Sequence, residues 1–208
     1  MERLLAVTVA ATARDLTTIG AAQAEIGASA DLAYVGRLVR QASAAVAAHL
    51  AALGVVAARE AVAETFRLSE PAPHLPLART PVATIASVVE DGITLVADTD
   101  YEFDTDAGLL YRLDSDVRIA WRAAKVVASY SGGWLLPGQT GANLPADIER
   151  ATLVTIAAWA ASQGRDPGLR SESAEGIGSQ SWLDPRAEHG ALPWQAAELL
   201  APWRRVGA

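Results

Sequence analysis

The acidic segment at residues 98–106, DTDYEFDTD, is the densest run of side chains in this sequence that could perform chemistry. Calcium loops present oxygen ligands at similarly spaced carboxylates. Two positions depart from that loop, because Phe103 stands where it requires glycine and Leu109 where it requires the bidentate glutamate. The strict alternation of residue types instead predicts a β-strand with one solvated face. We therefore expect no metal site in this segment.

The other residue types that support catalysis are not arranged for it. The three histidines, His49, His74 and His189, lie far apart and not at metal-ligand spacing. With no cysteine, the chain has neither disulfides nor thiolate chemistry. It lacks the GxSxG elbow and the Walker glycine loop, and the glycines at 176 and 178 follow a charged loop where a dinucleotide fingerprint needs a strand. We expect no catalytic residue, no metal and no cofactor.

The composition of the 208 residues limits the classes of partner. A hydrophobic content of 51% is ample for a core, whereas a net charge of −7 argues against a nucleic-acid-binding surface, which needs clustered lysine and arginine. No apolar run reaches the ~20 residues of a membrane span. Residues 1–13 faintly resemble a signal peptide, but threonines interrupt the apolar run and Arg14 and Asp15 follow it directly. We expect a soluble, intracellular protein with no membrane segment.

Two helices are expected near the start of the chain. The first, at 16–26, has a threonine cap and ends at Gly27, and the second, at 31–53, ends at Gly54. Apolar residues recur at helical spacing along the second helix, and a strip of alanines lies on its opposite face. That strip would allow close approach of another helix, from the same subunit or from the next.

A small β-region is expected after these helices. Glu90-Asp91-Gly92 is a strong hairpin turn, and prolines at 71, 73, 76 and 81 exclude a helix before it. The segment 117–130 is ambiguous, since its ends favour strands and its middle permits a bend. Besides the acidic segment, alternation predicts strands at 59–68, 82–89, 93–96 and 109–113.

The segment from 148 to 161 is nearly all apolar and predicts a helix, with Asp147 and Glu149 at its positive end and Gly164 beyond its last turn. Leu153 and Trp159 point in different directions around the axis. A helix that is apolar on every side must be buried on every side. Two interpretations stay open: a central core helix, or a helix with one face against a neighbouring subunit.

The C-terminal residues predict a short apolar stripe that Pro193 and Pro202 limit to about two helical turns. Because this short segment cannot bury two tryptophans by itself, we expect it to fold back on the body or to dock into another protein. We therefore expect an α+β fold that is mainly α, a helical bundle with a small antiparallel β-region and an extended C-terminal tail. The body would occupy residues 1–182 and the docking tail residues 183–208.

Taken in order, several strings resemble the head–tail adaptor proteins (head-completion or connector proteins) of long-tailed phages and gene transfer agents. The most specific are the helix LPADIERATLVTIAAWAASQG and the glycine–serine loop SESAEGIGSQSW that follows it. The insertion LLPGQTGAN and the alanine content depart from the family pattern and leave the subfamily open. The other similar strings are LTTIGAAQAEIG, DLAYVGRLVRQASAAVAAHL, PLARTPVATIASVVEDG, DYEFDTDAGLLYRL, SYSGGW and LPWQAAELLAPWRR.

The resemblance implies a structural role in the neck of a phage or gene transfer agent particle assembled in the bacterial cytoplasm. About a dozen copies would form a ring under the portal protein, extend the DNA channel and hold the next neck, stopper or tail protein. DNA would pass through without specific binding, and an acidic lumen would repel its phosphates. The alternatives are another neck or tail-completion protein of the particle, or an enzyme that uses residues 98–106.

The residues that the resemblance nominates are contact residues rather than catalytic ones. The portal-docking candidates are Trp194, Leu199, Leu200, Trp203, Arg204 and Arg205. The candidates for ring or neck contacts are Trp159, Glu172, Glu175, Gly176, Ile177, Gly178 and Trp182.

Overall fold

The computed structural model describes residues 1–122, 124–162, 171–174, 178–181 and 192–204, with the backbone alone for 171–174 and 178–181. The chain forms two compact units. The β unit contains residues 1–13 and 50–143, and the helical unit contains residues 14–49 and 144–204. The described part of the chain thus begins in the β unit, forms the first helices, returns to the β unit and then forms the remaining helices.

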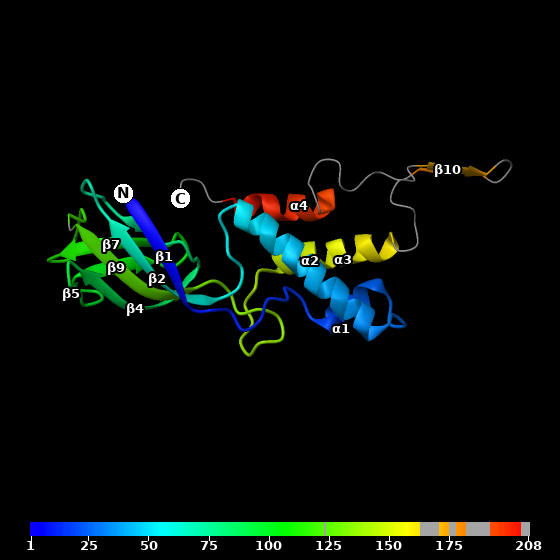
Figure 1. The fold of residues 1–208 in the computed structure, drawn as a ribbon, viewed down its shortest axis with the longest axis horizontal. Coiled ribbons are helices and arrows are strands. Elements are labelled where there is room, and N and C mark those ends of the chain that lie inside the picture. The colour runs from blue at the N-terminus through cyan, green and yellow to red at the C-terminus, as the bar shows by residue number, and fades with distance from the viewer. Residues whose placement is uncertain (123, 163–170, 175–177, 182–191, 205–208) are drawn as a thin grey trace. The chain divides into compact units, whose positions relative to one another are not determined.

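The β unit is built on a five-stranded antiparallel sheet in the order β1-β2-β9-β4-β5 (Figure 1). Two irregularities in the β4–β9 register, between Val82 and Thr84 and between Ile85 and Ser87, bend that pair. The strands are β1 (Glu2–Val9), β2 (Glu60–Arg67), β9 (Lys125–Gly132), β4 (Val82–Glu90) and β5 (Ile93–Thr94).

A second antiparallel sheet has the order β3-β7-β6, with β8 also paired to β7. Its strands are β3 (Leu75–Pro76), β6 (Tyr101–Asp104), β7 (Leu109–Asp114) and β8 (Val117–Ile119). Side chains from both sheets share one core. Alternation along β2 directs Val62 and Phe66 into it, and Trp121 is fully buried with its indole N–H donating to the Leu110 carbonyl at 3.1 Å.

The end of β9 approaches a neighbouring loop so closely that only glycine fits there. A Cβ atom on Gly132 would lie 2.2 Å from the carbonyl oxygen of Arg79. The next residue, Gly133, has a φ of 98°, and its N–H donates to the carbonyl of Pro81 at 2.9 Å. The Ser131-Gly132-Gly133 string therefore fastens this loop to the sheet.

The helical unit contains α1 (Ile19–Ile26), α3 (Ala146–Ala161), α4 (Trp194–Leu200) and most of α2 (Leu32–Ala52). A single 3-10 turn, η1 (Ala201–Trp203), follows α4, and a hairpin of β10 (Ser171–Ala174) and β11 (Gly178–Ser181) lies between α3 and α4 in the sequence. The Thr18 side chain caps α1 by accepting from the N–H of Ala21 at 3.1 Å. No helix among the described residues is long and apolar enough to cross a membrane.

The core of the helical unit forms where α1, α2 and α3 meet. Ala22, Val35, Val39 and Ile156 are buried there, with Trp159 packed against them. Small residues such as Ala22 and Ala42 let the helices approach closely.

The expectation of a mainly α-helical bundle with a small β-region is wrong, because two sheets with a common core make up the β unit. The strands expected at 59–68, 82–89, 93–96 and 109–113 are present as β2, β4, β5 and β7, and the strand expected in the acidic segment is shortened to β6. The sequence did not predict β1, whose apolar run resembles a signal peptide, or β3, which forms inside the proline-rich segment.

The expected extended C-terminal tail is also wrong for the described residues, because α4 packs against α3. Ala196, Ala197 and Leu200 are buried at spacings that place them on one face of α4, and Leu192, just before the helix, is buried as well. The boundary expected between residues 182 and 183 lies outside the described residues.

The helix α3 occurs as expected, but it is not buried on every side of the subunit. Ile148, Ala151 and Ile156 form part of one buried face, whereas Val154 and Ala158 are half-exposed. Its last turn ends at Ser162, and the expected stop at Gly164 lies outside the described residues.

Candidate interaction surfaces

The portal-docking candidates on α4 divide into exposed and buried side chains. Trp194, the first residue of the helix, is 54% exposed, whereas Leu200 is fully buried within the helical unit. Leu199 and Trp203 are half-buried and Arg204 is exposed. Tryptophan and arginine are both residue types that protein interfaces enrich. The last candidate, Arg205, lies outside the described residues.

The ring and neck candidates are less fully described. Glu172 lies in β10, in register with Gln180, and Gly178 begins β11, in register with Ala174. Trp159 is half-buried against the core of the helical unit, so it supports the packing of α3. The remaining candidates, Glu175, Gly176, Ile177 and Trp182, lie outside the described residues.

The carboxylates of the acidic segment stabilise turns and pair with arginines. Asp98 has a positive φ of 62° in the turn before β6, so the strand covers only four of the expected residues. Asp104 accepts from the N–H groups of Asp106 and Ala107 at 3.0 and 2.8 Å. Glu102 forms an ion pair with Arg118. Among the described residues, no group of three or more potential metal ligands converges.

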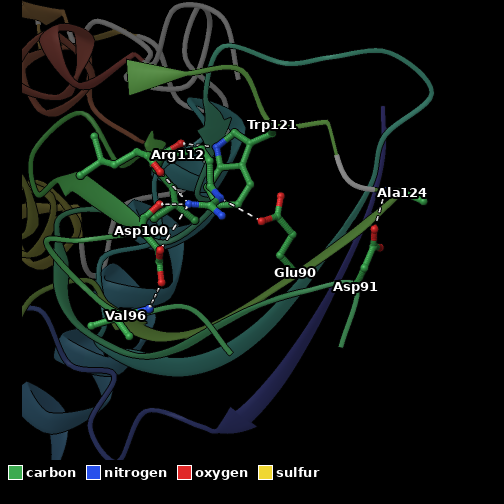
Figure 2. A network of polar contacts seen from close by, with 9 residues as sticks. Glu90, Asp91, Val96, Asp100, Arg112, Trp121 and Ala124 are labelled. Atoms are coloured by element: carbon green, nitrogen blue, oxygen red, sulfur yellow. Dashed lines mark hydrogen bonds and ion pairs between the residues drawn. The ribbon is translucent and has the colours of Figure 1, made fainter. Parts of the chain in front are cut away.

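Figure 2 shows the arginine that joins the acidic segment to the main sheet. The Nε of Arg112 donates to Glu90 at 2.8 Å, and its Nη1 donates to the carbonyl oxygens of Asp100 and Leu113, both at 2.7 Å. The Asp100 carboxylate lies 3.7 Å from the guanidinium and accepts from the N–H of Val96 at 2.8 Å. Every polar group here has a structural partner, so the cluster fixes loops.

A second polar network surrounds Glu64, which is fully buried on β2. The Tyr130 hydroxyl donates to its Oε2 at 2.6 Å, and the N–H of Ala78 donates to the same oxygen at 3.0 Å. Its Oε1 lies 3.3 Å from Nε of Arg3 on β1 and accepts no hydrogen bond within the described residues. Burial, and then the adjacent Glu64 charge, raise the pKa of Tyr130 well above its ordinary value. Glu64 thereby ties β1, β9 and the loop after β3 to β2.

Exposed apolar side chains at the edges of the main sheet were not predicted from the sequence. Leu4 and Val9 on β1, and Ile93 and Val96 at and after β5, are all exposed. The alternation in ERLLAVTV was available as a strand signal, but the short apolar run was compared only with a signal peptide.

No protein-family model matches this sequence, and no curated protein matches it. Its fold is similar to that of chains in three solved structures. A chain in the neck of an empty gene transfer agent (GTA) particle, computed with C6 symmetry, has a TM-score of 0.57 and 18% sequence identity. A chain in the neck of a native GTA particle, computed with C12 symmetry, has a TM-score of 0.56 and 16% identity.

The third similar chain belongs to the virion of a native gene transfer agent particle, with a TM-score of 0.56 and 15% identity. Each comparison covers 99% of this chain and 97% of the other. At these identities the likeness is one of fold, and it extends over both units.

Proposed function

We propose that this protein is a structural component of the neck of a gene transfer agent or phage particle. The observation that carries the proposal is the likeness of fold, over nearly the whole of both chains, to chains in GTA necks. The proposed location is the particle itself, and the proposed role includes no catalysis.

Within the neck, the role we propose is that of a head–tail adaptor. About a dozen copies form a ring under the portal protein, extend the DNA channel and offer a platform for the next neck, stopper or tail protein. The C12 symmetry applied to one of the similar necks is compatible with such a ring. The net charge of −7 suits a conduit that DNA passes without being held.

The docking surface we propose for the portal protein is the exposed side of α4 and the residues after it. Trp194 supplies the apolar anchor, and Arg204 and Arg205 supply positive charge, with Leu199 and Trp203 at the margin. Leu200 would act indirectly, because its burial holds α4 in place. Around the ring, Trp159 and the segment 172–182 are the proposed contact residues.

A deletion of the gene tests the role most directly. We expect tailless, DNA-filled heads and free tails, and we expect an epitope-tagged copy to restore joining and to lie at the neck in electron micrographs. Normal particles from the deletion strain would overturn the proposal.

Affinity purification of the tagged chain separates the adaptor from the alternative of another neck or tail-completion protein. An adaptor co-purifies with the portal protein from cells that make heads but no tails. A tail-side protein instead co-purifies with tail tubes from cells that make no heads, and that result would replace the adaptor role.

A further inference from the structure

Within the part of the chain that the structure describes, the main sheet has two unpaired edges, and both carry exposed apolar side chains. β1 stands at one end of the strand order and β5 at the other, as Figure 1 shows. Leu4 on β1 is 67% exposed, and Ile93 on β5 is 70% exposed. Isolated exposed apolar side chains are ordinary on protein surfaces. Here they gather at the two edges of one sheet.

β1 lacks most of the features that protect edge strands from pairing. Its eight residues include no proline, glycine or lysine, and its one arginine, Arg3, is held by Glu64. A register shift between Val7 and Val9 disturbs only its last residues. Within the described residues β1 pairs with β2 alone, so its outer side is open along its length.

The side chains of β1 contribute little to the subunit that carries them. Only Leu5 is half-buried, and the other seven residues are exposed. An apolar edge strand that buries few side chains in its own subunit is suited to contact with another protein.

The two edges also differ in charge. At the β1 edge the charges balance, because Arg3 pairs with Glu64 and Arg67 is in register with Glu2. At the β5 edge, exposed Asp91 and Asp98 flank the segment 93–96 and make this edge acidic. Two acidic edges repel each other, which favours contact of the β5 edge with the β1 edge over contact between two β5 edges.

We propose that the β1 edge of one copy contacts the β5 edge, residues 93–96, of the next copy. This inference rests on the proposed ring. A contact between two different surfaces of the same chain is heterologous, and it repeats around a ring when the rotation closes. It buries Leu4 and Val7 of one copy with Ile93 and Val96 of the next, which no copy can do alone.

Engineered cysteines test this contact sharply because the chain has no cysteine of its own. We would place Leu4→Cys and Ile93→Cys singly and together in the full chain, incorporate each variant into particles, and treat the particles with a short bismaleimide linker. All three variants change exposed side chains. The double variant should give a ladder of cross-linked oligomers on a denaturing gel, and each single variant should stay monomeric.

The other outcomes overturn the contact. Dimers of Leu4→Cys alone indicate that like edges pair, and cross-links to another protein indicate a different occupant. A double variant that is present in particles but stays monomeric shows that the two edges do not meet. These results leave the neck role intact, whereas absence of the chain from normal particles removes the role and the contact together.

A charge at the edge provides a second measurement with a matched control. Leu4→Glu places a negative charge opposite the acidic β5 edge and should reduce incorporation into particles at least tenfold while the isolated chain keeps its thermal stability. Val117→Glu places the same charge on β8 at a residue 62% exposed, and it should incorporate normally. Equal incorporation of the two variants would contradict the proposed contact.

Discussion

The two units of this chain are stabilised in different ways. Among the described residues, five ion pairs join segments of the β unit, whereas one, between Arg150 and Glu25, joins helices. The β unit also buries a carboxylate, Glu64, inside its core. A buried charge lowers stability unless it is paired. A pair forms only when both partners are held in fixed positions, so such pairs specify where the segments that carry them must lie. The β unit therefore gains fixed loops and strand positions from these contacts.

The helical unit relies on the close packing of small and apolar side chains. Its buried hydroxyls are satisfied locally, since Thr152 and Thr155 donate to carbonyl oxygens of their own helix at 3.0 and 2.8 Å. Half-exposed apolar residues such as Val154 and Ala158 remain on α3. The β unit therefore fixes its strands and loops through paired charges, whereas the helical unit packs apolar side chains and leaves some of them half-exposed on α3.

The largest effect is expected in the β core. Trp121→Ala removes a fully buried indole and its hydrogen bond to Leu110, and it should lower the free energy of unfolding by about 4 kcal/mol. Chemical denaturation measures this loss. Hydrogen exchange should show lost protection in β2 and β9 with α3 unchanged, and an equal loss in α3 would break the distinction between the units.

A matched deletion in the helical core comes next. Ile156→Ala should cost about 3 kcal/mol, because Ile156 is fully buried between helices, whereas Ile156→Val should cost about 1 kcal/mol. If the two variants lose nearly the same free energy of unfolding, the helices have moved together to fill the cavity. That result would contradict close, fixed packing in this unit.

Removal of a single oxygen atom tests the polar network around Glu64 in the β unit. Tyr130→Phe removes the hydroxyl that donates to Glu64 and leaves that buried carboxylate with fewer partners. We expect a loss of about 1–3 kcal/mol from the free energy of unfolding. Tyr34→Phe, on the less buried Tyr34 of α2, is the control and should change stability little. Equal stability of Tyr130→Phe and Tyr34→Phe would show that the Glu64 network does not stabilise the β unit.

The same phenol predicts how stability depends on pH. Burial and the charge of Glu64 raise the pKa of Tyr130 in the folded state, so the folded protein holds this proton more tightly than the unfolded chain does. The contribution is fully present below pH about 10, the pKa of an ordinary tyrosine, and falls as pH rises above that value. Unfolding followed between pH 8 and 11 should therefore show an alkaline loss that is smaller in Tyr130→Phe.

The sequence predicts local features of this fold better than their assembly. The helices at 16–26 and 31–53 and the hairpin turn at Glu90-Asp91-Gly92 follow from spacing and turn residues, and they are present. The sheets depend on contacts between distant segments, such as Arg3 with Glu64, and no local pattern encodes these. Which face of α4 is buried likewise depends on α3, so the sequence nominated both Trp194 and the buried Leu200.

The smallest effect on stability is expected at the proposed docking surface. Trp194→Ala removes a side chain that is 54% exposed, so the free energy of unfolding should change by less than about 1 kcal/mol. Binding to the portal protein should nevertheless fall by at least tenfold, since a central tryptophan typically contributes about 2 kcal/mol or more to an interface. Gln195→Ala, at the adjacent exposed position of α4, is the matched control and should bind normally. A pull-down of portal protein with each variant separates a contact residue from a residue that only maintains the helix, because only the former lowers binding while leaving stability unchanged.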